Sequence, residues 1–171
     1  MCGINGIFNF NKVNIGDEKA LISLMNDTIS HRGPDDSGVS EINQRLFFGH
    51  RRLSIIDLSK AGHQPMRNDA AYEIVFNGEI YNYTELKKYL PDYKFKSDSD
   101  TEVLLGLYEK FGESCIKYLN GMFAFAIWDP KKEQIFLARD RSGKKPLYYS
   151  FQNGVFAFSS EVKALLKLPF I

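Results

Sequence analysis

The second residue of the chain is a cysteine, and its position allows a chemistry that an internal cysteine could not perform. If Met1 is removed, Cys2 carries both a thiol and a free α-amine. An α-amine with an unperturbed pKa of about 8 is roughly half neutral at physiological pH, so it can take the proton of its own side chain. No distant histidine is then required. For a cysteine at position 2 of an arbitrary protein, a small buried residue in a first strand is the more common explanation.

Asn77 and Gly78 offer a second chemical function. They follow the alternating segment Ala71–Phe76, which predicts a strand that ends at this pair. A side-chain amide beside an unhindered backbone N–H is the pair of donors that an oxyanion hole needs. The alternative is a two-residue hairpin turn, for which Asn-Gly is a strong signal. The residues after Gly78 run into a helix-capping pattern instead of an answering strand, and the two interpretations stand about even.

Two charged residues could bind the ends of a polar substrate. Ser99 and Glu102 have the spacing of a capping box, which places Asp100 at the first helical position. Its carboxylate there either meets a cationic group or only stabilises the helix dipole, and the residue type alone favours the dipole. Arg51 and Arg52 precede the apolar, partly buried stretch 53–57, and an arginine projecting from it would suit bidentate binding of a carboxylate. A surface charge is an equally good interpretation of either arginine.

Other polar residues predict no separate site. The alternating carboxylates of Ser97–Asp100 lack further clustered ligands, so a metal site is not expected there. His31, His50 and His63 have no metal-ligand spacing and are expected to be structural. The basic stretch Arg139–Pro146 fits neither a P-loop nor a dinucleotide fingerprint, and we predict a hairpin connection between strands.

Strands and helices that would position these residues follow from hydrophobic periodicity and turn signals. Strands are predicted at Cys2–Phe10, Ala71–Phe76, Met122–Trp128, Gln134–Ala138, Leu147–Phe151 and Val155–Phe158. Helices are predicted at Asp17–Ser30, from the Asn82/Glu85 capping spacing, from Ser99 to Gly112, and at Glu161–Leu168. His31–Gly38 is expected to be an irregular loop. Antiparallel strands buried on both faces and flanked by helices predict an α+β fold of two stacked sheets between helical layers.

Composition narrows the class of protein. The 171 residues are 44% hydrophobic, enough for one domain with a real core, and no linker or repeat divides residues 1–171. The net charge of +1 provides no field that would favour nucleic acid or an anionic membrane. Neither a signal peptide nor a membrane span is apparent, so we expect a cytoplasmic protein. Cys2 and Cys115 form no disulfide framework.

Eight motifs in order resemble one family across essentially the whole chain. They are Cys2-Gly3-Ile4, HRGPDDSG (31–38), RLSIID (52–57), NGEIYNY (77–83), SDTEVLL (99–105), GMFAFAIWD (121–129), RDRSGKKPLYY (139–149) and SSEVKALL (159–166). Together they resemble the glutaminase domain of the glutamine-hydrolysing asparagine synthetases. The resemblance implies a class II glutamine amidotransferase of the N-terminal-nucleophile (Ntn) hydrolase fold, a four-layer αββα sandwich.

The same resemblance implies a role for each candidate residue. Cys2 would attack the side-chain amide of glutamine, while Asn77 and the Gly78 N–H would hold the oxyanion. Ammonia would leave, and water would hydrolyse the γ-glutamyl thioester. The substrate's α-carboxylate would bind Arg52, and its α-ammonium would bind Asp100 and Glu79. Backbone groups of Leu53 and Ile55 would add contacts.

The resemblance also indicates what this sequence does not contain. The family carries a second domain that uses ATP to activate a carboxylate, with a Ser-Gly-Gly-x-Asp-Ser loop that is missing here. No metal or organic cofactor is expected for the glutaminase reaction, and ATP and Mg²⁺ would be expected only in that absent synthetase domain. The chain is therefore expected to be a fragment, a natural stand-alone protein being less favoured. Its partners would be glutamine and the synthetase domain, with neither nucleic acid nor membrane.

Two alternatives remain at this point. The domain could belong to another class II amidotransferase that amidates a sugar acid or other carboxylate, because the acceptor is chosen by the absent domain. It could also be a non-catalytic glutamine-binding module, although binding alone would not require a terminal thiol.

Overall fold

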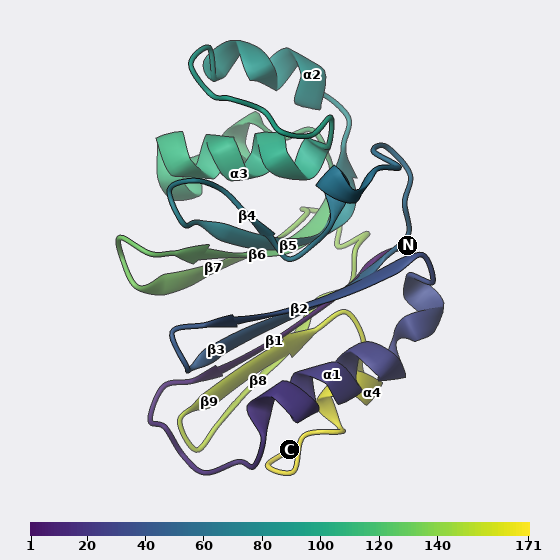
Figure 1. Ribbon diagram of the computed structural model, residues 1–171, viewed down its shortest axis with the longest axis vertical. Coiled ribbons are helices and arrows are strands. Elements are labelled where there is room, and N and C mark those ends of the chain that lie inside the picture. The colour runs from purple at the N-terminus through teal and green to yellow at the C-terminus, as the bar shows by residue number, and fades with distance from the viewer.

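Two antiparallel sheets lie face to face at the centre of the molecule, as the computed structural model of residues 1–171 shows (Figure 1). The first sheet has the strand order β2-β3-β1-β9-β8, and the second has the order β4-β5-β6-β7. The strands are β1 (Gly3–Asn9), β2 (Asp36–Ile42), β3 (Leu46–Arg52), β4 (Met66–Arg67), β5 (Glu73–Ile80), β6 (Gly121–Asp129), β7 (Gln134–Arg139), β8 (Tyr148–Gln152) and β9 (Val155–Ser159).

Helices cover the outer face of each sheet. The helices α1 (Glu18–Thr28) and α4 (Val162–Leu165) lie on the first sheet, and α3 (Asp100–Phe111) lies on the second (Figure 1). The short helix α2 (Tyr83–Leu86) packs on the far side of α3. Asp17 caps α1 by accepting a hydrogen bond from the Ala20 N–H at 3.0 Å. Gly112 ends α3 with a φ of 58°, a conformation that glycine adopts without strain. The predicted αββα order of layers is confirmed.

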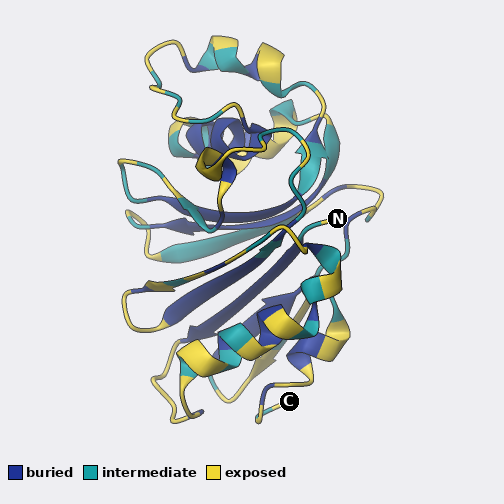
Figure 2. Ribbon diagram, turned by 45° about the vertical axis from the view of Figure 1, so that its right-hand side comes forward, coloured by how far each residue is buried: buried dark blue, intermediate teal, exposed yellow.

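Buried residues form three clusters, one between the two sheets and one between each sheet and its helices. Figure 2 shows the buried segments of the ribbon in dark blue. Ile7 packs with the α1 residues Ile22 and Met25 on one outer face. Between the sheets, the core contains Ile4, Phe8, Phe48, Val75, Ala124, Trp128 and Phe158. The α3 side chains Val103, Leu104 and Leu107 pack with Ile74 and Phe125 on the other outer face. All seven residues of β1 are buried, which explains its apolar sequence and places it at the centre of its sheet.

The strand that carries Asn77 is longer than the sequence predicted. We expected it to end at Phe76, but β5 continues to Ile80 and pairs with β6 throughout, with Asn77 opposite Ala124 and Gly78 opposite Phe123. Asn77-Gly78 is therefore not a hairpin turn. The Asn82/Glu85 capping box is also absent, because the Asn82 side chain bonds to Tyr118 and Asn120 instead.

Two connections also differ from expectation. The segment 31–38 is only partly irregular, because its last residues begin β2, which forms a hairpin with β3 that the sequence analysis did not predict. The predicted hairpin across 139–146 is wrong, since β7 and β8 belong to different sheets and this segment crosses between them. The short strand β4 was not predicted either. The other strands and helices lie where the periodicity placed them, within a few residues at their ends. No helix in the structure has the length and apolar character needed to cross a bilayer.

Candidate active site

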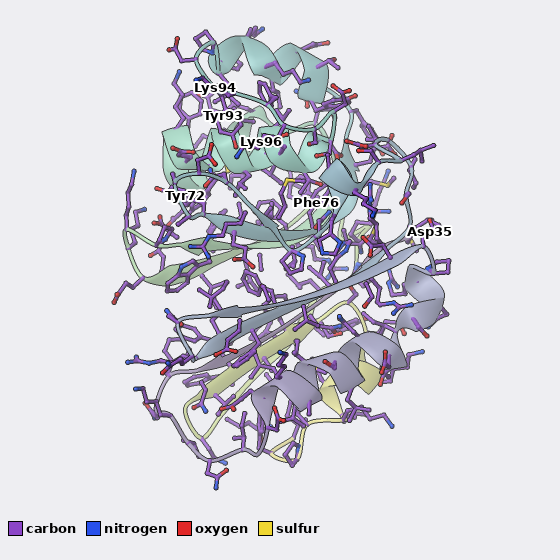
Figure 3. All side chains as sticks on the ribbon, viewed as in Figure 1. Asp35, Tyr72, Phe76, Tyr93, Lys94 and Lys96 are labelled. Carbon is purple, nitrogen blue, oxygen red and sulfur yellow. The ribbon has the colours of Figure 1, made fainter.

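All eight residues proposed for chemistry or substrate binding line one cavity. It is about 80 Å³ in volume and is lined by Cys2, Arg52, Leu53, Ile55, Asn77, Gly78, Glu79 and Asp100, together with residues that include Lys145. Cys2 directly precedes β1, and the others come from β3, β5, α3 and two connecting segments. A larger cavity of about 630 Å³ contains none of them. Figure 3 places Tyr93, Lys94 and Lys96 of this larger cavity beside α3. Phe76, which lines the cavity at Cys2, lies away from them.

The backbone holds the Cys2 thiol at the start of β1. Its Sγ accepts a hydrogen bond from the Leu53 N–H at 3.4 Å and donates to the Leu53 carbonyl at 3.5 Å. Burial raises the pKa of the thiol, while the Leu53 backbone, the N-terminal amine and Arg52 oppose that rise. Ionising Cys2 therefore requires a nearby base and positive charge.

Asn77 presents a buried amide that has no partner within the protein. Only 1% of the residue is exposed, and neither Oδ1 nor Nδ2 makes a hydrogen bond. A buried polar group without a partner costs free energy, so it usually marks a position that a ligand or water completes. The amide lines the same cavity as Cys2. It is available to donate to an oxygen bound there.

Two carboxylates form a negatively charged side of the cavity. Asp100 is 4% exposed, and its Oδ2 accepts a hydrogen bond from the Ile80 N–H at 2.9 Å. Burial raises the pKa of Asp100 to about 6, and the negative charge of Glu79 adds to that rise. The mutual repulsion of these carboxylates would be relieved by a bound cation such as an α-ammonium. Asp100 is also the first residue of α3, as predicted from the Ser99 cap.

Arg52 is the last residue of β3 and is 8% exposed. Its guanidinium donates to the Ser59 carbonyl at 2.9 Å and to the Asp57 carbonyl, which fixes it against the following loop. The apolar stretch after it forms no strand and is partly buried, with Ile55 65% exposed. Arg52 is therefore held by its own strand and by loop carbonyls.

Three further residues at the site were not proposed individually from the sequence. Arg32 donates from Nε to the Cys2 carbonyl at 2.9 Å and pairs with Glu161 at 3.1 Å, which anchors the backbone of Cys2. Lys145 is a buried amine on the cavity wall, and Asp140 holds the turn that carries it. Each of them lies in one of the motifs described above. They come together because segment 139–146 crosses from one sheet to the other, which the sequence did not predict.

The histidines pair with protein groups. His31 lies 2.9 Å from Glu161, and His63 lies 2.6 Å from Asp36. His50 contacts the Phe76 carbonyl at 3.1 Å, and burial lowers its pKa to about 4. The structure contains no group of three or more His, Cys, Asp and Glu side chains placed to hold a metal ion.

Comparison with known proteins agrees with this geometry. A sequence profile for the glutamine amidotransferase domain matches residues 1–171. The chain belongs to the glutamine amidotransferase domain family. It is 45% identical to asparagine synthetase [glutamine-hydrolyzing] 3 of Bacillus subtilis over 99% of this chain and 28% of that protein. It is 46% identical to asparagine synthetase [glutamine-hydrolyzing] 1 of the same organism, over 97% of this chain and 27% of that protein. This glutamine amidotransferase domain thus spans little more than a quarter of these relatives' length.

The fold is shared more widely. The glutamine phosphoribosylpyrophosphate amidotransferase of B. subtilis, solved with ADP and GMP, superposes with a TM-score of 0.79 over 98% of this chain and 43% of that one. Sequence identity is only 22%, so this likeness concerns the fold alone. The architecture is that of an Ntn hydrolase, as the motifs implied.

Proposed function

We propose that this glutamine amidotransferase domain hydrolyses glutamine to glutamate and ammonia in the cavity at Cys2. The observation that carries the proposal is the unpartnered amide of Asn77 in the same small cavity as the Cys2 thiol. A nucleophile beside a donor that lacks an acceptor is the arrangement that acyl transfer requires.

In the proposed reaction the α-amine of Cys2 takes the thiol proton, and the thiolate attacks the side-chain carbonyl carbon of glutamine. The resulting oxyanion accepts hydrogen bonds from the Asn77 amide and the Gly78 N–H. As the carbon–nitrogen bond breaks, the α-ammonium returns its proton to the leaving nitrogen, and ammonia departs. The same amine then takes a proton from water, which attacks the γ-glutamyl thioester and releases glutamate and the thiol.

The remaining cavity residues supply the proposed substrate recognition. The α-carboxylate of glutamine pairs with Arg52, which is already oriented by the loop carbonyls. The α-ammonium lies between Asp100 and Glu79, where it relieves the repulsion of the two carboxylates. Leu53 and Ile55 add backbone contacts. No metal or organic cofactor takes part in this half-reaction.

The ammonia would serve an ATP-dependent amidation in the larger protein to which such domains belong. The B. subtilis relatives are asparagine synthetases in which the matched region is 27–28% of the length. We therefore propose a C-terminal synthetase domain as the partner, with aspartate as the favoured acceptor and another carboxylate as the alternative. ATP and Mg²⁺ would belong to that domain.

The decisive experiment concerns the terminal amine. Intact mass should show that the purified chain begins at Cys2, and this form should release ammonia from glutamine. A version with an uncleaved N-terminal extension should be folded but inactive, because its α-amine is no longer on the nucleophile. Cys2→Ala should also be folded and inactive. Cys2→Ser should lose most of the rate because an alcohol ionises far less readily than a thiol.

Cys115→Ser is the matched control. Cys115 is fully buried away from the cavity, where burial raises its thiol pKa to about 12, so its removal should leave glutaminase activity intact. Glutamine hydrolysis at the untagged rate by a protein with a verified N-terminal extension would contradict the proposed base. Glutamine binding without ammonia release by the Cys2 form would instead favour a non-catalytic module.

A further inference from the structure

Lys145 is a buried cation of the site whose ammonium has no partner. The residue is 5% exposed and lines the cavity with Cys2. The neighbouring cations already have partners within the protein. Arg52 donates to a loop carbonyl, and Arg32 bonds to the Cys2 carbonyl and pairs with Glu161. The ion pairs of the domain do not include Lys145. Its ammonium is therefore available to a group within the cavity that it lines.

The turn before Lys145 is built to hold the residue in place. The carboxylate of Asp140 accepts hydrogen bonds from the N–H groups of Ser142 at 3.1 Å, Lys144 at 2.9 Å and Lys145 at 3.0 Å. It also accepts from the Phe123 N–H of β6 at 3.2 Å, which attaches the turn to the second sheet. The Lys145 carbonyl in turn accepts from Arg139 Nε at 2.7 Å. The backbone of Lys145 is thus fixed on both sides of its α-carbon.

An ammonium that belongs to a cavity-lining residue and has no protein partner would be stabilised by an anion in that cavity. Burial lowers the pKa of the Lys145 amine, and the positive charge of Arg32 acts in the same direction. The charges of the Cys2 thiolate, Glu79 and Asp140 act in the opposite direction. Among these anions, the thiolate is the one that forms and disappears during the reaction.

The other negative groups of the proposed reaction have dedicated partners. Arg52 takes the substrate α-carboxylate, and Asn77 takes the oxyanion. The charges of the N-terminal amine and Arg52 favour ionisation of the Cys2 thiol, whereas the carboxylate of Asp100 opposes it. We propose that the ammonium of Lys145 stabilises the Cys2 thiolate, so that Lys145 is a positioning residue that acts through the nucleophile. This role deepens the proposed glutaminase function and rests on Cys2 being its nucleophile.

The experiment measures how fast iodoacetamide alkylates Cys2 as a function of pH, with intact mass as the readout. All proteins carry Cys115→Ser and begin at Cys2, so the signal comes from one thiol. Lys145→Met should raise the titration midpoint and slow alkylation about tenfold near neutral pH, which corresponds to one pKa unit. Lys145→Gln should behave alike, and Lys145→Arg should restore the midpoint because it keeps the charge. Lys144→Met, an exposed cation of the same turn, is the matched control and should behave like the parent.

An unchanged midpoint in folded Lys145→Met or Lys145→Gln would overturn the proposal. A rise in the KM for glutamine with an unchanged midpoint would instead make Lys145 a substrate ligand, which also overturns it. The readout is independent of glutaminase activity. A midpoint shift in a chain that releases no ammonia would leave this inference standing and refute the proposed function, whereas ammonia release without a midpoint shift would do the reverse.

Discussion

The proposed role of the Asn77 amide as an oxyanion donor predicts a specific change in kcat. Asn77→Ala should lower kcat by about 10² to 10³, because an oxyanion donor stabilises the transition state more than the bound substrate. Thermal stability should change little, since the amide has no protein partner to lose. Steady-state ammonia release and thermal denaturation of the same preparation would test both parts. A lower melting temperature with an unchanged kcat would show that Asn77 is only structural.

Asp100 should make both glutamine binding and stability depend on pH. Because burial raises its pKa to about 6, the carboxylate loses its charge as the pH falls through that value. The KM for glutamine should therefore rise below about pH 6 if Asp100 binds the α-ammonium. Asp100→Asn should have a high KM that no longer changes in this range. A parallel pH dependence in Asp100→Asn would assign the titration to another group.

The sign of the stability effect is opposite to that of an ordinary paired carboxylate. The folded pKa of about 6 lies above the usual 3.8, so ionisation of Asp100 destabilises the folded state as the pH rises between these values. Asp100→Asn should thus raise the free energy of unfolding by about 3 kcal/mol near pH 8 and by much less near pH 3. Chemical denaturation at both pH values measures the difference. Equal effects at the two pH values would mean that the carboxylate's charge carries no such cost.

Among single residues, the sequence best predicted those whose type and local pattern suggest a specific chemical role. Cys2, Asn77 and Asp100 could be proposed from residue type, local pattern and resemblance, and the structure brings them to one cavity. Arg32 and Lys145 could not be predicted in the same way. Arg32 bonds to Cys2 and to Glu161, which lie 30 and 129 positions away, and Lys145 shares a cavity with Cys2 near the other end of the chain. No local pattern encodes these relations.

The pairing of β5 with β6 explains why position 78 requires glycine. A Cβ there would overlap the Met122 carbonyl and the Phe123 Cα of β6, both of which are backbone atoms that side-chain motion cannot relieve. Gly78→Ala should therefore displace the neighbouring strand, lower stability by about 1–3 kcal/mol and reduce glutaminase activity. Denaturant unfolding and ammonia release provide the two measurements.

Gly106 within α3 is the matched control. A Cβ at this position would meet only side-chain atoms of Leu90 and Tyr93, at 3.0 to 3.2 Å, and alanine is the better helix former. Gly106→Ala should be close to neutral in both assays. Comparable losses in the two variants would show that the crowding at Gly78 has no special consequence.

The errors made for strands share a physical cause. Amphipathic helices and the C-terminal strands could be predicted because their periodicity is local. The extension of β5 through Asn77-Gly78 depends on pairing with β6, which overrides the local turn signal. Likewise, a short connection between β7 and β8 suggested a hairpin, but the two strands pair with β6 and β9 in opposite sheets. Pairing between distant strands is not determined by the turn alone.

For the whole molecule, the proposed division of labour predicts which products the isolated chain can make. It should release ammonia from glutamine into solution, and it should form no asparagine from aspartate and ATP. Ammonia and asparagine can be measured in the same reaction, with the Cys2→Ala protein as the blank. ATP-dependent formation of asparagine by this chain alone would contradict the assignment of amidation to a further domain.

The layered architecture could be predicted from the sequence, but which strands belong to which sheet could not. Continuous apolar strands between amphipathic helices require two sheets with buried inner faces. Which strands share a sheet is decided by packing across the whole chain, as the neighbouring positions of β1 and β9 illustrate.

That neighbouring position also sets the order of events during synthesis. β1 lies between β3 and β9, and the Ile4 N–H bonds to Ser160 Oγ at 2.9 Å, so the first strand is completed only by the last. A growing chain therefore keeps one edge of its N-terminal strand open until residue 160 has emerged from the ribosome. The sheet that carries the N-terminal strand is therefore completed only after nearly the whole domain has been synthesised.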